Sequence, residues 1–402
     1  MYDISNLKKS NAKTSSPYST NHVINMAPRD ASINHNTLGT LSAENADGNN
    51  LGPSKQTGVL FECDADTADG ALAIDVNLRK RAEKRKLKLV WRNIILFGYL
   101  HVAALYGAWL LFTSAKWPTV FFSIFLYSIG VLGITAGAHR LWAHRSYKAK
   151  WPLRLILIAF NTCAFQDAAY HWARDHRVHH KFSETDADPH NATRGFFFSH
   201  VGWLLCKKHP DVIAKGKSLD LTDLHADRIL MFQLKHYMLL MPLACFILPT
   251  VIPMYFWDES FINSWFVATM FRWCVLLNVT WCVNSAAHKF GGRPYDKSIN
   301  PSENPGVALF AFGEGWHNYH HVFPWDYKTA EWGNYSMNLT TAFIDFFAKI
   351  GWAYDLKSVS SEIIEKRVAR TGDGSHELWG YGDKDITKED EQGIITINKK
   401  SE

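Results

Sequence analysis

The sequence predicts an all-α integral membrane protein with four transmembrane helices and a histidine-ligated site for two metal ions on its cytosolic side. Two observations carry this prediction. Long apolar runs with few charges occur in two pairs, at about residues 90–112 with 117–138 and 237–257 with 261–283. Histidines gather in four short motifs that follow these runs or lie between them. Together they indicate a helical bundle with a polar centre at one membrane face.

The N-terminal segment differs in composition from the rest of the chain. Residues 1–78 are rich in Asn, Ser, Thr, Asp and Ala and hold few large apolar side chains. Such a segment cannot offset the entropy lost on ordering, so we expect a disordered tail. No apolar stretch follows a basic start, so no secretory signal is predicted. The mild net charge of +5 indicates no nucleic-acid partner.

Cysteine usage indicates neither a zinc site nor a disulfide framework, because the spacing is never CxxC and the density is low. The six cysteines are Cys63, Cys163, Cys206, Cys245, Cys274 and Cys282.

Two of the apolar runs contain no charge. Trp117–Ala138 has 22 residues, which as a helix would be about 33 Å long against a hydrocarbon core of about 30 Å. Tyr237–Trp257 is the second. Buried helices of soluble proteins seldom need runs this long, so both are predicted to cross a membrane.

The other two spans carry one charge each. Val90–Phe112 contains Arg92 near its start, and Phe261–Val283 contains Arg272 near its middle. A fifth apolar stretch, Trp151–Phe165, is shorter and includes an arginine. We expect it to lie in the membrane interface.

Basic residues set the expected orientation. Residues Arg79–Arg92 include eight Lys or Arg, whereas the turn Thr113–Lys116 includes one and the turn Asp258–Ser260 none. Basic residues favour the cytosolic side, so the N-terminus is predicted there. Four crossings return residues 139–236 and the chain after 288 to that side, with both termini. All histidine motifs can then meet in one compartment.

The histidine motifs are HRLWAH, HRVHH, NSAAH and EGWHNYHH. In HRVHH and EGWHNYHH the spacing i, i+3, i+4 places three imidazoles on one helix face, which predicts that they converge on one point. Nine of the 19 histidines belong to these motifs: His139, His144, His176, His179, His180, His288, His317, His320 and His321. The others are interpreted as surface or structural residues: His22, His35, His101, His171, His190, His200, His209, His225, His236 and His376.

Nine neutral imidazoles predict two metal ions, because a catalytic zinc takes three protein ligands and a structural zinc four. Imidazole suits iron, zinc, copper and nickel, so ligand type leaves the metal open. A redox role is favoured, since an oxygen-activating centre at the membrane face would reach lipid-derived chains. Asn284, one turn before His288, is a candidate to carry a metal-bound water. Glu314 and Asp175 are candidates to accept hydrogen bonds from imidazole N–H groups.

These motifs, with the flanking GITAGAHR, WARDHRVHHKFSETDADPHN and RGFFFSHVGWLL, closely resemble the animal-type acyl-CoA desaturases, and RTGDGSHELWGYGDKD resembles the insect branch. The resemblance runs from about Lys86 to Lys357. It implies a membrane-bound desaturase domain over residues 79–357, with four spans and a cytosolic helical cap, then a helix end and flexible tail over 358–402. It also implies residence in the endoplasmic reticulum membrane and two non-haem iron ions on the nine histidines, with Asn284 bound through water.

The resemblance further implies a reaction. Such enzymes use O2 and electrons from cytochrome b5, reduced by its NADH-dependent reductase, to insert a cis double bond into a fatty acyl-CoA. The stearoyl-CoA (Δ9) type acts on saturated C16 or C18 chains, and the segment Asn300–Glu303 looks closer to that type. No HPGG haem motif of a fused cytochrome b5 domain is present, so an external donor is implied.

Substrate contacts are also implied by the resemblance. The acyl chain would bend beside Gln166, Trp172 and Thr280, above a tunnel floor at Tyr127 and Val131. Val131 is larger than alanine or glycine, which predicts a modestly shortened tunnel. Phosphates of coenzyme A call for cations at the cytosolic rim, where the candidates are Asn93, Arg174, Asp175, Lys207 and Lys208. Three residues depart from the family pattern and leave chain length and double-bond position open: Asp167, Ala168 and His171.

Other functions remain open at this point. A desaturase of different regioselectivity, such as Δ11, or an acyl-lipid desaturase or membrane hydroxylase would use a similar cluster. A metal transporter is a remote alternative, because transporters place ionisable ligands at mid-depth in the bilayer. Here, apart from Arg92 near the start of the first span, only His101 and Arg272 fall inside the predicted spans.

Overall fold

A computed structural model describes residues 87–376 and 392–393. The expected tail over residues 1–78 lies outside the described residues, as does most of the tail predicted beyond 376. Within residues 87–376 the structure is mostly helical, with turns and loops between the helices and one small antiparallel sheet. Its strands are β1 (Lys148–Ala149) and β2 (Ala353–Tyr354), with Lys148 opposite Tyr354.

In the part of the chain that the structure describes, four helical segments are long and apolar enough to cross a membrane, and the predicted helical membrane fold is confirmed. The first is α2 (Trp91–Thr113), and the others are continuous helices that contain π-helical stretches. The second joins α3 (Trp117–Leu132) to η2 (Gly133–Ala143). The third joins α9 (Arg228–Pro242), η5 (Leu243–Ile247) and α10 (Leu248–Trp257). The fourth joins α11 (Phe261–Asn263), η6 (Ser264–Phe271) and α12 (Arg272–Ser285).

Two spans extend beyond their apolar runs. The second continues five residues past Ala138, and the third begins at Arg228 rather than near residue 237. The earlier start has a local cause: Asp227 Oδ1 accepts hydrogen bonds from the backbone N–H groups of Ile229 (3.0 Å) and Leu230 (3.3 Å) and so caps α9. Apolar runs mark only the bilayer-deep part of a helix, whereas polar end residues prolong it.

One carboxylate ties together the two turns at the end of the spans away from the histidines. Glu259 is buried, and its Oε2 accepts hydrogen bonds from the Lys116 backbone N–H (2.9 Å) and Thr119 Oγ1 (2.6 Å). Its Oε1 accepts from the Ser260 N–H (3.0 Å) and Asn263 Nδ2 (3.0 Å). The second and fourth spans are thereby fastened at this end.

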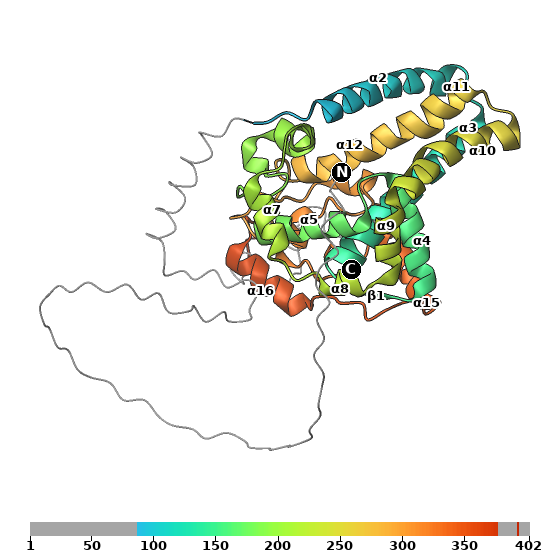
Figure 1. Cartoon of the computed structure of the whole chain (residues 1–402). Helices are drawn as coiled ribbons and strands as arrows, with labels where there is room; N and C mark the ends of the chain where they lie inside the picture. Colours follow the sequence, from blue (N-terminus) through green and yellow to red (C-terminus); the bar gives the residue numbers. More distant parts are fainter. Residues whose placement is uncertain (1–86, 377–391, 394–402) are drawn as a thin grey trace, which may run out of the picture. The chain divides into compact units, whose positions relative to one another are not determined.

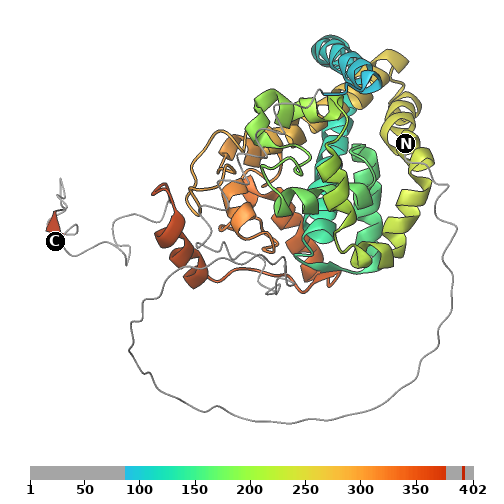
Figure 2. The same cartoon turned by 60° about the vertical axis from the view of Figure 1, so that its left-hand side comes forward.

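The remaining helices form a cap at the opposite end of the spans, where α16 lies at the edge in both views (Figure 1; Figure 2). Between the second and third spans it contains α4 (Trp151–Ala164), α5 (Ala169–Lys181), η3 (Ala192–Arg194), η4 (Phe198–Gly202), α6 (Trp203–Leu205), α7 (Pro210–Lys217) and α8 (Thr222–Ala226). After the fourth span it contains α13 (Pro305–Phe310), α14 (His317–Val322), η7 (Tyr335–Met337), α15 (Leu339–Lys349) and α16 (Ser361–Thr371).

The apolar stretch expected in the membrane interface forms α4, which is too short to cross a bilayer. It packs lengthwise along the second span. The contact is close because Gly133 has no side chain: a Cβ there would lie 2.2 Å from the Asn161 backbone nitrogen. A Cβ at Gly130 would lie 3.7 Å from the Cα of Ala164. The C-terminal end of α4 therefore lies beside the middle of the second span.

Candidate metal centre

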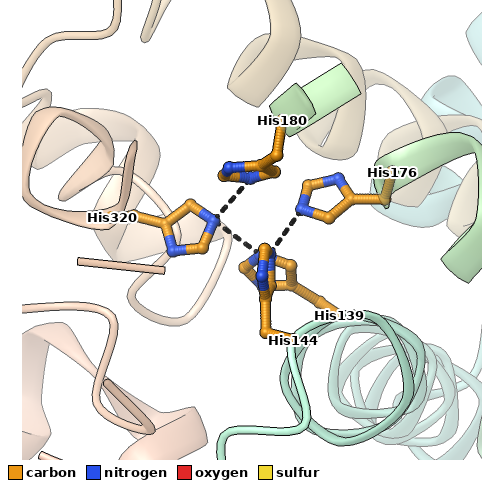
Figure 3. Close-up of side chains that lie close together, drawn as sticks. All are labelled: His139, His144, His176, His180 and His320. Carbon is orange, nitrogen blue, oxygen red and sulfur yellow. Dashed lines mark hydrogen bonds between the residues drawn. The ribbon is translucent and has the colours of Figure 1, made fainter. Parts of the chain in front are cut away.

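The structure brings the nine motif histidines together in two groups, each able to hold a metal ion. Within a group the ligand atoms all lie within 4.8 Å of one another. The first group contains His139, His144, His176, His180 and His320 (Figure 3). The second contains His179, His288, His317 and His321.

In the first group the Nε2 atoms face one another (Figure 3). Nε2 of His320 lies 3.0 Å from Nε2 of His139 and 3.0 Å from Nε2 of His180. Nε2 of His176 lies 2.8 Å from Nε2 of His144. Five imidazoles from η2, α5, α14 and the residue after η2 thus present the same ring atom to one point.

The second group has the same character. Nε2 of His317 lies 3.0 Å from Nε2 of His288 and 3.1 Å from Nε2 of His321. Nε2 of His179 lies 3.3 Å from Nε2 of His321. All but His321 are buried.

Each i, i+3, i+4 motif is divided between the two groups, so the expectation that its three imidazoles converge on one point is wrong. On α5, His176 and His180 join the first group and His179 the second. On α14, His317 and His321 join the second group and His320 the first. Residues i and i+4 differ by about 40° around a helix, whereas i+3 lies about 100° from i+4. The i+3 imidazole therefore points to the other group.

The spacing of the nitrogens fits a cation. Two nitrogens bound to one metal at about 2.1 Å are about 3.0 Å apart at a right angle and about 3.4 Å apart at a tetrahedral angle. The observed 2.8–3.1 Å separations in these groups match the right-angle case, except for His179 and His321 at 3.3 Å. Five ligands in the first group also exceed the four of a structural zinc.

Buried carboxylates set the tautomers of two histidines. Glu314 Oε2 lies 2.7 Å from Nδ1 of His139, and Asp188 Oδ1 lies 2.9 Å from Nδ1 of His179. A carboxylate only accepts, so each Nδ1 carries the proton and each Nε2 presents a lone pair to its group. Lone pairs that face one another repel unless a cation lies between them.

The charge state of the site favours metal binding. Burial, together with neighbouring imidazoles, lowers the pKa of the histidines well below the ordinary value at six positions: His144, His176, His180, His317, His320 and His321. Neutral imidazole is the form that binds metals. Burial alone would raise the pKa of Glu314, but Arg140 and His139 hold it below its usual value. The carboxylate is therefore ionised.

Of the two carboxylates predicted to accept hydrogen bonds from imidazole N–H groups, one has this role in the structure. Glu314 accepts from an imidazole as expected, but Asp175 does not. Asp175 instead pairs with Arg174 (2.7 Å) and with Lys208. Asp188 takes the expected role, from a turn after α5 whose position relative to His179 no helical spacing predicts. From the sequence, His190 is interpreted as structural. Its ring lies beside that of His179, and the two ring centroids are 4.3 Å apart.

Comparison with known proteins decides the family. The model of the fatty acid desaturase family matches residues 115–355. The chain belongs to the fatty acid desaturase family. This desaturase is similar to the acyl-CoA Δ9 desaturase of Acheta domesticus, with 64% identity over 353 residues that cover 87% of this chain and 98% of the relative. It is 58% identical to the acyl-CoA Δ12 desaturase of that cricket over 351 residues, with the same coverage. It is 58% identical to human stearoyl-CoA desaturase over 297 residues, 74% of this chain and 82% of the relative.

The family resemblance drawn from the motifs is confirmed, and the desaturase is an oxidoreductase. The metal transporter is excluded by this membership. Among the described residues the nine motif histidines form two groups able to bind metal, and His179 also forms a third with Asp188 and His190. The predicted count of two ions stays a prediction.

Of the residues expected at the acyl bend, Trp172 lies beside the histidines, while Gln166 and Thr280 are bonded to each other. Gln166 Nε2 donates to Thr280 Oγ1 at 2.9 Å, joining the segment after α4 to α12. The Trp172 ring stacks on His176 with centroids 4.8 Å apart and meets the His139 ring edge-on at 5.9 Å. A bent chain beside Trp172 would therefore pass next to the first group.

The expected floor residues share one apolar cluster. Val131 is 3% exposed and packs with Ile134, Ala164 and Leu276, and Tyr127 packs against the same cluster. Trp172 borders it as well. Trp172 at the proposed bend and Val131 at the proposed floor thus border one cluster, although they lie about forty residues apart in the chain.

The five rim candidates are held at the junction of α2, α5 and the segment after α6. Asn93 Nδ2 donates to the Leu204 carbonyl at 2.7 Å. The Lys207 backbone N–H donates to the Lys88 carbonyl at 2.8 Å. Asp175 joins Arg174 to Lys208. Asn284 lies on α12 one turn before His288, half-buried, and its water-mediated role stays a prediction.

Proposed function

We propose that this desaturase inserts a cis double bond, at Δ9, into saturated C16 or C18 fatty acyl-CoA, using O2 and two electrons from cytochrome b5. The balanced reaction converts –CH2–CH2–, O2, two electrons and two protons into –CH=CH– and two waters. The convergence of nine imidazoles in two groups carries the proposal, because cleaving an unactivated methylene C–H requires a metal-based oxidant.

The proposed metals are two non-haem irons. His139, His144, His176, His180 and His320 would hold one, and His179, His288, His317 and His321, with Asn284 through a water, would hold the other. Bound iron would supply the oxidising power from O2. Right-angle nitrogen spacing and a five-histidine group support a metal of higher coordination number than tetrahedral zinc.

The protein's own residues would position the substrate. Gln166 and Thr280, joined at 2.9 Å, would hold the chain bent against Trp172, and Tyr127 and Val131 would limit its length. Arg174, Lys207 and Lys208 would attract the phosphates of coenzyme A, with Asn93 and Asp175 shaping the rim. Burial of these apolar walls would keep water away from the reacting carbons.

The proposal also covers the double-bond position, Δ9, and the membrane in which the enzyme resides. The 64% identical relative is named for Δ9 chemistry, whereas a 58% identical relative is named for Δ12, so the higher identity supports Δ9. Four apolar helices and the basic run before α2 support an endoplasmic reticulum membrane protein with both termini cytosolic.

Expression in a host that lacks its own Δ9 desaturase tests the function. Fatty acids are profiled by mass spectrometry with double-bond localisation, alongside an empty vector. New cis-Δ9 C16 and C18 acids are expected. No new unsaturated acid, with the protein present in membranes and an electron donor available, contradicts the proposal. A product at Δ11 or Δ12 replaces the Δ9 assignment and leaves the desaturase.

A further inference from the structure

Arg272 is a buried cation near the middle of the fourth span. It is 2% exposed, and within residues 87–376 it forms no ion pair. A charged side chain at bilayer mid-depth is costly and is usually functional, so its presence calls for a reason. Its guanidinium donates hydrogen bonds to backbone carbonyls of two other segments.

The guanidinium joins three helices. Its Nη1 donates to the Cys163 carbonyl (3.1 Å), its Nη2 donates to the Cys245 carbonyl (3.0 Å), and its Nε donates weakly to the Ala268 carbonyl (3.4 Å). Cys163 lies in the last turn of α4, and Cys245 lies in η5 of the third span. Arg272 thus connects α4 and the third span to the fourth.

Both distant carbonyls lie where the α-helical hydrogen-bond pattern is interrupted: Cys245 is in the π-helical η5, and Cys163 is in the last turn of α4. The α-helical donor to Cys245 would be residue 249, which is a proline without an N–H. The donor to Cys163 would be residue 167, but α4 ends at Ala164 and the chain turns away through Phe165 (φ 47°). A planar fork with five donors can satisfy two such carbonyls at once, whereas a lysine ammonium presents a single point charge.

The segment that follows Cys163 is fastened to the same helix at two further points. The Phe165 ring stacks on Trp273 with centroids 4.8 Å apart and planes 14° from parallel. Gln166 then donates to Thr280, two turns along α12 from Arg272. Arg272, Trp273 and Thr280 therefore fix the depth of the turn between α4 and α5 relative to the fourth span.

We infer that Arg272 is a positioning residue for the substrate: by holding the end of α4 against α12 it sets the Gln166–Thr280 pair at a fixed distance from the histidine groups. This inference rests on the proposed function, in which that pair lines the acyl bend. Arg272 then determines which carbon atoms of the acyl chain lie beside the metals, although it is not itself among the residues proposed to line the bend.

The test compares wild type with Arg272→Met and Arg272→Lys, purified with their iron and supplied with acyl-CoA and an electron donor. Misplacing the bend should lower kcat by roughly ten- to a hundredfold in Arg272→Met. The KM for acyl-CoA should change little, because the rim is untouched. The double bond should appear at more than one position. Arg272→Lys, which keeps the charge without the fork, should lie between the two.

Glu259→Gln is the matched control, since it removes a buried polar tie at the other end of the spans. It should lower thermal stability while the product position and the kcat of the folded enzyme stay those of wild type. A single wild-type product position and wild-type kcat in folded Arg272→Met would overturn the inference.

A second variant covers failure of Arg272→Met to accumulate in membranes. Trp273→Phe loosens the stack on Phe165 and should also spread the double-bond position. Unchanged product position in both Trp273→Phe and Arg272→Lys would overturn the inference. Inactive wild type contradicts the proposed function instead, so the two failures are distinguishable.

Discussion

Glu314 and His139 are joined by a buried hydrogen bond of 2.7 Å between carboxylate Oε2 and ring Nδ1. The same carboxylate accepts from Arg140 at 2.8 Å through Nη2 and 3.1 Å through Nε, and the Arg140 side chain is fully buried. Arg140 therefore keeps Glu314 ionised, and Glu314 keeps the His139 lone pair on the Nε2 that faces His320. One ion pair thus orients a candidate ligand.

Replacing this carboxylate tests its role. Glu314→Gln keeps the size but removes the charge, and it leaves Arg140 buried without its partner. We expect metal affinity to fall by about 10- to 100-fold, with loss of activity at limiting iron. The iron content of the purified protein, and its activity as a function of added iron, measure this loss of affinity. Glu362→Gln, from an exposed pair with Lys366, should change neither. Full iron content in Glu314→Gln would contradict the role.

Removing one imidazole of the second group tests the division into two sites. His317→Ala should lower bound iron from two ions per chain toward one and abolish the unsaturated product, because His317 is buried between His288 and His321. Metal analysis of purified protein and fatty-acid profiling measure the two effects. His236→Ala removes a histidine outside both groups and should leave both unchanged. Wild-type activity in His317→Ala would remove it from the ligand set.

A glycine contact between α4 and the second span should be intolerant of change. Gly133→Ala would place a Cβ 2.2 Å from the Asn161 backbone nitrogen, so α4 must move. We expect a loss of about 3 kcal/mol in the free energy of unfolding, or failure to accumulate. Gly98→Ala, with open space around the new Cβ, should be neutral or stabilising by about 0.5–1 kcal/mol. Thermal unfolding in detergent compares them, and equal melting temperatures would contradict the prediction.

Glu259 predicts a pH dependence of stability. Burial alone would raise its pKa, but hydrogen bonds from Thr119, Asn263, Lys116 and Ser260 hold it below the ordinary value of 4.5. A carboxyl with a lowered folded-state pKa contributes stability above its unfolded pKa, and this is lost as pH falls through the folded pKa. Glu259→Gln should therefore be destabilised relative to wild type at pH 7, with the gap narrowing in acid.

Melting temperatures of both proteins at neutral pH and below pH 4 measure this difference, with Glu362→Gln as the exposed control. If the difference in melting temperature between wild type and Glu259→Gln grew on acidification, the predicted pH dependence would be wrong.

Val131 should limit chain length if the proposed tunnel ends beside it. Val131→Ala removes two methyl groups from a cluster with Ile134, Ala164 and Leu276. We expect the kcat/KM ratio of longer to shorter acyl-CoA to rise by about tenfold. Ile124→Ala, an exposed β-branched residue on the same helix, should leave the ratio unchanged. No gain on longer substrates in Val131→Ala would contradict the shortened tunnel.

Much of the fold was predictable because the signals are local. Charge-free runs specify spans through their length, and π-helical continuation with polar residues explains why η2 reaches Ala143 beyond the apolar run. The candidate ligands were predictable because HRVHH and EGWHNYHH repeat imidazoles at helical spacing. The hydrogen-bond partner of Asp175 was not predictable, since a carboxylate next to a histidine motif can pair with Lys208 as readily as with an imidazole.

The sequence by itself determined the four apolar helices and the nine candidate histidine ligands, because these follow from length, periodicity and residue chemistry along one chain. Only the tertiary structure decided that His179 and His320 join the opposite group from their motif neighbours, that Asp188 orients His179, and that Arg272 joins α4 to the third and fourth spans. Helical spacing gives the angle of each side chain around its own axis. Which of the two histidine groups that side chain joins depends on where the other helices pack.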